Sequence, residues 1–233
     1  MEVSATLYYL AIIVFILSLI AQLRVTGTFK KYSRITCKSG LTGYDLAIAL
    51  LKKHDISNIK VRRTKGKLTD HFDPVALEVR LSEGVYSRNS VAALGVAAHE
   101  IGHVIQHFNG FLPYRIRTAI FPVVSFGSNL AIPIFFIGLI SSARSLLLVG
   151  IILFLAIVLF QIVTLPVEFD ASRRALKELE NEHFLQPEEL DMAGEVLRAA
   201  ALTYVANTIG TIVQLLRLIA IAKNGKSKRV MII

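Results

Sequence analysis

The chain has 233 residues, of which 54% are hydrophobic and 18% charged, and its mean hydropathy is positive. This composition excludes an ordinary soluble domain of the same length and indicates a membrane protein. The formal net charge is +9, but no nucleic-acid-binding motif accompanies the basic residues, so anionic lipid headgroups explain them better and no nucleic-acid partner is expected.

The first apolar run extends from Ser4 to Leu23 and contains no charged residue. It reaches the roughly 20 residues that a helix needs to cross a ~30 Å hydrocarbon core. A cleaved signal peptide is the alternative, but the run lacks a basic leader and a convincing cleavage site. We therefore interpret residues 1–23 as an uncleaved transmembrane anchor.

Residues 24–118 form the next predicted unit, a small catalytic part that carries both helix and strand. Apolar residues at helical spacing predict a helix from Tyr44 to Lys53. The segments Ile59 to Arg63 and Val75 to Leu81 have the composition of extended chain and predict a small sheet.

A longer helix is predicted from Ser87 to Phe108. Asn89 or Ser90 would cap its start, and Asn109 followed by Gly110 would end it. This helix carries an HExxH motif at residues 99–103 near its C-terminal end.

The motif predicts a metal site. His99 and His103 are four residues apart, so both imidazoles lie on one helical face and can reach one zinc ion. Glu100 can reach a zinc-bound water instead of the metal, take up its proton and later protonate the leaving amine. The alternative is a helix with two hydrogen-bonded histidines, but the small residues around the motif favour burial, where an unpaired His pair is costly.

A third ligand is needed, and the sequence limits where it can lie. A metzincin would have Gly and His at the positions of Gln106 and Asn109, so that class is excluded. His107 lies about 12 Å along the helix from His99 and is too far away to share one ion with both motif histidines.

Two further apolar runs follow, at about residues 119–140 and 145–165, and they predict a transmembrane hairpin over residues 119–165. Glu168 comes directly after the hairpin, where a new helix would begin. Because the chain crosses the membrane and returns, Glu168 should lie on the same side as His103, and it fits the gluzincin pattern. The alternative is an acidic residue in a first helical turn, stabilised by the macrodipole. Asp170 is the second choice of ligand.

Residues 166–233 are predicted to be helical and to complete the metal site. The apolar stretch 209–222 is interrupted by Gln214 and Arg217, and several basic residues follow it. A helix lying on or against the membrane is preferred to a fourth span, because it keeps those basic residues on the cytoplasmic side.

The orientation follows from the basic residues, because short loops rich in Lys and Arg stay in the cytoplasm. Only Arg144 marks the turn of the hairpin, whereas many basic residues flank the other ends of the three spans: Arg24, Lys30, Lys31, Arg34, Arg115, Arg117, Arg173, Arg174 and Lys177. The N-terminus is expected outside and the catalytic part in the cytoplasm.

Several separated sequence segments, taken in their order along the chain, resemble the YugP-like neutral zinc metallopeptidases. These are a bacterial membrane family whose motif pattern is related to that of the CAAX-protease and HtpX-type gluzincins. The segments are LTDHFDP at 68–74, RLS at 80–82 running on to AALGVAAHE at 92–100, FGSNL at 126–130, LPVEFDASRRA at 165–175 and LRAAALTYVA at 197–206. The resemblance implies one zinc ion at His99, His103 and Glu168, Glu100 as catalytic base, and a multi-pass protein of the cell membrane.

The same resemblance raises three finer expectations. Gluzincins place Asp four residues after the ligand Glu to orient a ligating His, and here Ser172 has that position, with Asp170 as the other candidate. In related zincins an edge strand before the metal helix pairs with the substrate, and Val75, Leu77 and Val79 are placed to do so. Tyr204 is a candidate donor to the oxyanion.

The sequence therefore predicts a mainly α membrane protein with about three transmembrane helices. A small zincin-like α+β cytoplasmic unit would carry the metal site on two helices. The expected activity is hydrolysis of peptide bonds by a zinc metalloendopeptidase of the plasma membrane, with membrane-associated polypeptides as substrates. The alternative is a catalytically inactive metal-binding membrane scaffold, and the retention of Glu100 argues against it.

Overall fold

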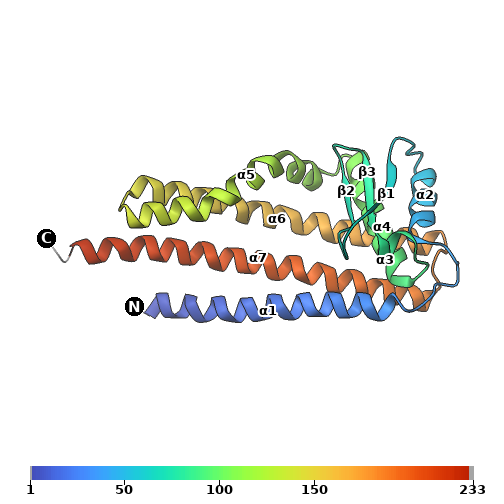
Figure 1. Cartoon of the computed structure of the whole chain (residues 1–233), viewed down its shortest axis with the longest axis horizontal. Coiled ribbons are helices and arrows are strands. Elements are labelled where there is room, and N and C mark those ends of the chain that lie inside the picture. Colours follow the sequence, from blue (N-terminus) through green and yellow to red (C-terminus); the bar gives the residue numbers. More distant parts are fainter. Residues whose placement is uncertain (1, 231–233) are drawn as a thin grey trace. The chain divides into compact units, whose positions relative to one another are not determined.

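The computed structural model describes residues 2–230 and the side chains of residues 5–223, and it is mainly helical (Figure 1). Its elements in chain order are α1 (Glu2–Tyr32), α2 (Gly43–Lys53), β1 (Lys60–Thr64), β2 (His71–Asp73), β3 (Glu78–Ser82), α3 (Glu83–Tyr86), α4 (Val91–Phe108), α5 (Leu112–Ile140), α6 (Arg144–Asn181) and α7 (Pro187–Val230).

The chain divides into two compact units. The first, which we call the apolar unit, comprises Arg115–Leu165 together with the described residues up to Ile20 and from Tyr204 onward. The second, which we call the mixed unit, comprises Ala21–Tyr114 and Pro166–Thr203 and contains all three strands.

Four helices of the described chain are long and apolar enough to cross a membrane: Ala5–Tyr32, Leu112–Ile140, Arg144–Asn181 and Pro187–Lys223. At most 22% of the most apolar window of each is buried within the protein. Apolar side chains exposed on this scale need lipid around them.

The predicted transmembrane hairpin, residues 119–165, lies within the apolar unit, where α5 and α6 pack closely. A Cβ added to Gly150 would come within 2.8 Å of Phe135, and one added to Gly138 within 2.6 Å of the Leu147 nitrogen. The core of this unit consists of Ala131, Phe135, Phe154, Val158, Leu215 and Leu218.

The stretch 209–222 is part of one long helix, α7, rather than a separate helix. Arg217, which interrupts this stretch, donates a hydrogen bond of 2.9 Å to Gln214 and lies 5.6 Å from the ring centroid of Tyr8. These two contacts give the guanidinium group partners within the apolar unit.

The predicted metal-motif helix is confirmed as α4. Ser90 caps its start by accepting a hydrogen bond from the Ala93 nitrogen, and Asn109 and Gly110, the latter with φ +64°, end it. The helix begins at Val91 rather than Ser87, because residues 83–86 form the separate short helix α3. Its buried side chains pack with those of α2 and the sheet in the core of the mixed unit.

The sheet has the strand order β1-β3-β2, with β1 parallel and β2 antiparallel to β3. The prediction of an edge strand at Val75–Leu81 is therefore wrong, since β3 is flanked on both sides. Val79 lies in this central strand and is fully buried, while the edges of the sheet are β1 and β2.

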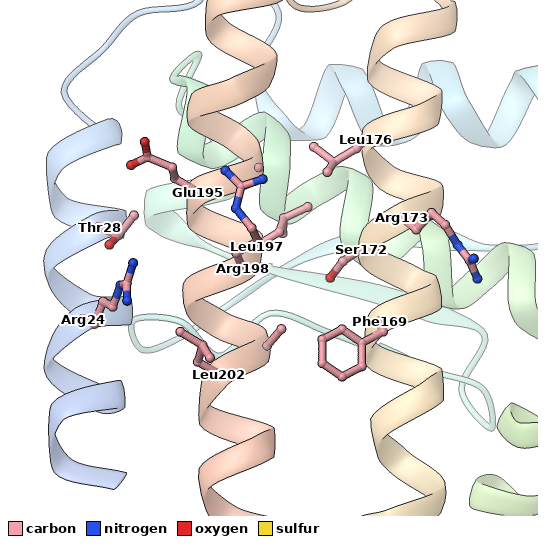
Figure 2. Close-up of a pocket in the computed structure, with 12 residues that line it drawn as sticks. Arg24, Thr28, Phe169, Ser172, Arg173, Leu176, Glu195, Leu197, Arg198 and Leu202 are labelled. Carbon is pink, nitrogen blue, oxygen red and sulfur yellow. The ribbon is translucent and has the colours of Figure 1, made fainter. Parts of the chain in front are cut away.

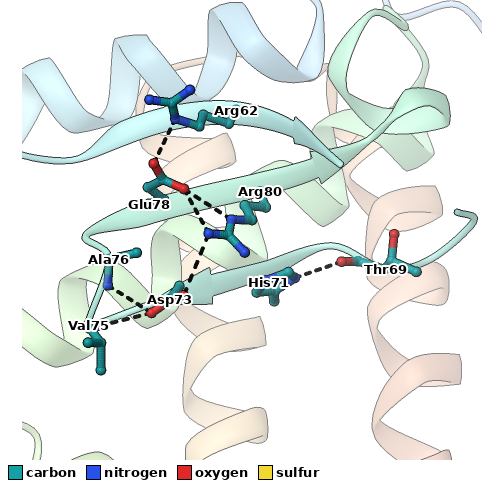
Figure 3. A network of polar contacts seen from close by, with 8 residues as sticks. All are labelled: Arg62, Thr69, His71, Asp73, Val75, Ala76, Glu78 and Arg80. Carbon is teal, nitrogen blue, oxygen red and sulfur yellow. Dashed lines mark hydrogen bonds and ion pairs between the residues drawn. The ribbon is translucent and has the colours of Figure 1, made fainter. Parts of the chain in front are cut away.

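Val75 and Leu77 lie outside the strand because a turn precedes it. The Asp73 carboxylate accepts hydrogen bonds from the nitrogens of Val75 (3.0 Å) and Ala76 (2.9 Å) (Figure 3). Leu77 has a positive φ of 53°, a conformation that an extended strand never has. The composition of residues 75–81 predicted an extended strand, but the hydrogen bonds to Asp73 hold the first part of this segment in a turn.

The helix that carries Glu168 does not begin after the third span, as the sequence predicted, because α6 runs without a break from Arg144 to Asn181. Pro166 lies inside it, although an interior proline removes a backbone donor and costs about 3 kcal/mol. Four fully buried residues beyond it, Val167, Ala171, Ala175 and Leu179, offset that cost by packing into the mixed unit.

Candidate metal centre

Helix α4 presents the HExxH motif towards α6 at a close crossing of the two helices. Gly102 makes the crossing possible, since an added Cβ would lie 2.6 Å from the backbone oxygen of Ala171. The two histidines of α4 and Glu168 of α6 are brought together there, all within the mixed unit.

The ligating atoms of His99, His103 and Glu168 all lie within 4.8 Å of one another. The Oε2 of Glu168 is 3.3 Å from Nε2 of His99 and 3.6 Å from Nε2 of His103. In a tetrahedral site with metal–ligand bonds of about 2.0 to 2.1 Å, neighbouring ligand atoms are roughly 3.3 Å apart. The donor set therefore suits zinc, and the two distances from Glu168 are close to the tetrahedral value.

The orientation of His103 is set by a buried amide. Gln106 is completely buried, and its Nε2 donates to the backbone oxygen of Val167 (2.8 Å) and to Oδ2 of Asp170 (2.9 Å). Its Oε1 lies 3.0 Å from Nδ1 of His103 and, being an acceptor only, requires a proton on that nitrogen. The lone pair of Nε2 is thereby left for a metal.

His99 is oriented from the other helix by Ser172. The Ser172 hydroxyl lies 3.1 Å from Nδ1 of His99, which leaves Nε2 directed at Glu168. Ser172 thus makes the contact that the Asp of the gluzincin pattern would make. Both candidates for orienting the histidines have partners here, since Ser172 contacts His99 and Asp170 contacts His103 through Gln106.

Asp170 lies outside the group of three converging ligand atoms. Its two oxygens accept hydrogen bonds from Arg173 (2.6 Å), Arg174 (2.5 Å) and Gln106 (2.9 Å). Both oxygens of Asp170 are thus engaged by donors other than a metal, which favours Glu168 over Asp170 as the third ligand.

Glu100 follows His99 on α4, and only 6% of its surface is exposed. This places a largely buried carboxylate next to the candidate metal ligands, where a general base would act. Glu168 is still more buried, at 2% exposed.

Two further candidates from the sequence are His107 and Tyr204. The ring of His107 packs against Phe72 and Tyr114 with centroid separations of 5.7 and 5.9 Å, and it is not among the converging ligands. Tyr204 belongs to the apolar unit, and its contribution to the oxyanion stays a prediction.

Gln106 is the residue that the sequence analysis missed. The available signal was its spacing, because residues three apart on a helix face each other and Gln106 follows His103 by three. An amide in an otherwise apolar helical stretch was a second signal, since a buried amide requires partners.

Comparison with known proteins agrees with this geometry. The family model described as "Putative neutral zinc metallopeptidase" matches residues 7–223. The chain is 42% identical over 212 residues to "Putative membrane protease YugP" of Bacillus subtilis (strain 168), which covers 91% of this chain and 94% of that protein. No solved structure matches the chain. With its long apolar helices, the chain is a membrane protein, and it belongs to the family of neutral zinc metallopeptidases.

Proposed function

We propose that the protein is a membrane-embedded zinc metalloendopeptidase in which His99, His103 and Glu168 hold one zinc ion and Glu100 is the general base. The observation that carries the proposal is the convergence of two imidazole nitrogens and one carboxylate oxygen within 4.8 Å of one another, with the Glu168 oxygen 3.3 and 3.6 Å from the two Nε2 atoms. Three protein ligands leave a fourth position for water, as in catalytic zinc sites.

When bound, a zinc ion lowers the pKa of a coordinated water to about 7 and polarises the carbonyl of the substrate. Glu100 takes a proton from the attacking water as its oxygen bonds to the carbonyl carbon. The carbon–nitrogen bond then breaks, and Glu100 passes the proton to the nitrogen of the departing amine. Gln106 holds His103 in the tautomer that leaves Nε2 for the metal, and Ser172 contacts Nδ1 of His99 and so helps to orient that ring.

The second candidate function is an inactive metal-binding membrane scaffold. A purely structural zinc site needs four closed ligands and no base. Glu100 directly follows the candidate ligand His99 and places a carboxylate beside the metal ligands, so the site offers a base, which favours the peptidase.

The site is proposed to face the cytoplasm from the plasma membrane. The support is the charge distribution, in which basic residues flank every end of the first three apolar runs except the N-terminus and the hairpin turn, where Arg144 stands alone. Glu168 follows the uncharged run 145–167 directly in sequence, so we propose polypeptides at the membrane surface as substrates.

The test is peptide hydrolysis by the detergent-purified full chain and its Glu100→Gln variant, with zinc content measured on both. We expect Glu100→Gln to keep its zinc and to lose hydrolysis by a factor of about 10² to 10⁴. Glu188→Gln, an exposed change of the same kind on α7, should leave both unchanged. A zinc-loaded Glu100→Gln protein with full activity would refute the mechanism, and zinc-loaded wild type that cleaves no peptide would favour the scaffold.

A further inference from the structure

A pocket of about 510 Å³ lies within the mixed unit, between residues of α1, α6 and α7 (Figure 2). Ligand pockets in proteins have volumes of roughly 300 to 1,000 Å³, so this one has the size of a binding site. The metal ligands are not among the residues that line it. Two residues of its wall connect to the metal centre: Ser172 contacts His99, and Arg173 pairs with Asp170.

The charged groups of the pocket are predominantly basic. Arg24, Arg173 and Arg198 line it, against one acidic residue, Glu195. The Glu195 carboxylate accepts a hydrogen bond of 2.6 Å from the hydroxyl of Tyr32, a residue outside the pocket.

Two of the three arginines are not held in a close ion pair, although both lie near enough to Glu195 to attract its carboxylate. Arg173 is paired with Asp170 at 2.6 Å. Arg24 and Arg198 are exposed and form no ion pair with the acidic side chains in the described part of the chain. They lie on α1 and α7, on either side of Glu195 in Figure 2. Two such guanidinium groups suit a singly charged phosphodiester.

The position of these arginines along their helices is the second observation. Arg24 ends the uncharged run 3–23 of α1, and Arg198 precedes the uncharged run 199–216 of α7. On α6, the uncharged run 145–167 ends just before the pocket residue Phe169. The pocket therefore lies where three apolar helices each meet the first charged residues, which is the level of lipid headgroups in a membrane.

The apolar residues of the pocket lie towards those uncharged runs. Phe169 and Leu202 are 49% and 41% exposed, and Figure 2 shows both near one end of the pocket, with Arg198 and Arg173 nearer the other. A ligand that fills the pocket thus meets charge at one end and apolar surface at the other.

We infer that this pocket binds the headgroup of an anionic phospholipid. The phosphodiester lies between Arg24 and Arg198, and the start of an acyl chain lies over Phe169 and Leu202. A free phosphate ion would share the arginines but leave the apolar end unused. This inference does not depend on peptidase activity and holds if the protein cleaves nothing.

The experiment measures phospholipid binding to the delipidated full chain in detergent, by titration with phosphatidylglycerol and with phosphatidylcholine. Each basic residue near a headgroup contributes slightly more than a factor of about 5 in affinity. The Arg24→Gln/Arg198→Gln variant should therefore bind phosphatidylglycerol about thirtyfold more weakly. The matched control is Arg34→Gln/Arg88→Gln, which removes two exposed arginines of the mixed unit outside the pocket and should change affinity less than twofold. Arg24→Lys/Arg198→Lys retains the charge and should keep most of the affinity.

Three results would overturn the inference. The first is equal phosphatidylglycerol affinity in the wild type and the Arg24→Gln/Arg198→Gln variant. The second is equal loss in the control variant, which would make the effect one of net charge. The third comes from competition: inorganic phosphate or an acidic peptide displaces the bound lipid at the same concentration as a soluble short-chain phosphatidylglycerol does. The pocket would then be assigned to the phosphate or the peptide instead.

Discussion

The histidines of the metal centre are each held by a different kind of partner. Gln106 holds His103 from the same helix, and Ser172 holds His99 from α6. The motif itself predicted the two histidines, because their spacing alone places them on one face. Ser172 could be identified from sequence because it follows Glu168 by four residues, the spacing of the orienting Asp in gluzincins. The role of Gln106 depends on Val167 and Asp170, which are more than sixty residues away and could not be paired with it from sequence.

Replacing Gln106 tests this arrangement. Gln106→Leu removes the acceptor for Nδ1 of His103 and leaves the Val167 oxygen without its donor, so zinc affinity should fall about 10- to 100-fold. The measurement is competition for zinc with a chromophoric chelator. Gln186→Leu, an exposed change of the same kind, should leave the affinity unchanged. Zinc binding by Gln106→Leu as tight as that of the wild type would contradict the role assigned to this amide.

At the scale of elements, the crossing of α4 and α6 creates the site. The sequence predicted α4 and its caps correctly because hydrophobic spacing and cap residues are local signals. It did not predict that α6 continues through Pro166, because the packing that offsets the proline is tertiary. It placed Val75 and Leu77 in a strand because the hydrogen bonds that Asp73 makes to the turn are invisible in an apolar pattern.

The closeness of the crossing gives a prediction for Gly102. Gly102→Ala inserts a Cβ where the Ala171 oxygen would be 2.6 Å away, so the helices must separate. We expect a loss of roughly 1 to 3 kcal/mol in unfolding free energy, together with weaker zinc binding. Gly27→Ala is the control, because no atom lies within 4 Å of its added Cβ and a helical Gly→Ala change stabilises by roughly 0.5 to 1 kcal/mol. A Gly102→Ala protein as stable as the wild type would contradict the close crossing.

The turn before β3 should make stability depend on pH through Asp73. Hydrogen bonds from the backbone nitrogens of Ala76 and Val75, with the nearby Arg80, lower the pKa of the Asp73 carboxyl below its ordinary value. The folded state therefore favours the carboxylate. This stabilisation is complete above the unfolded pKa of about 3.9 and is lost as the pH falls through the lower folded pKa.

Asp73→Ala should accordingly be less stable than the wild type at pH 7, and the difference should shrink below about pH 4. Denaturant unfolding of both proteins between pH 7 and pH 3 measures it. The difference in unfolding free energy between the Asp73→Asn and Asp73→Ala variants should not change with pH, because neither asparagine nor alanine titrates. A wild-type advantage that grows on acidification would show that the sign is wrong.

At the scale of the whole molecule, composition and uncharged runs predicted a membrane protein, since crossing a bilayer requires about 20 consecutive apolar residues. Four helices of the described chain meet that requirement, including α7. For residues 209–222 the sequence favoured a helix lying on or against the membrane, because Gln214 and Arg217 interrupt the apolar stretch and basic residues follow it. The hydrogen bond between Gln214 and Arg217 and the contact of Arg217 with the Tyr8 ring come from the folded apolar unit, and the second is not apparent from sequence.

The proposed orientation can be tested by labelling single cysteines in intact cells. Cys37 is the chain's single cysteine and is 3% exposed, so its own labelling should be low. Ser142→Cys, in the turn between α5 and α6, should react with a membrane-impermeant maleimide added outside. Lys67→Cys, in the loop between β1 and β2, should react only after lysis. The reverse pattern would place the metal centre outside the cell.

The most direct test of the account is the zinc content of the full chain and of Glu168→Ala, combined with zinc X-ray absorption spectroscopy. The wild type should hold one zinc ion per chain with nitrogen and oxygen ligands at about 2.0 to 2.2 Å. Glu168→Ala should lose the ion, whereas Glu180→Ala, an exposed change on the same helix, should retain it. Unchanged zinc binding by Glu168→Ala would contradict the assignment of Glu168 as the third ligand.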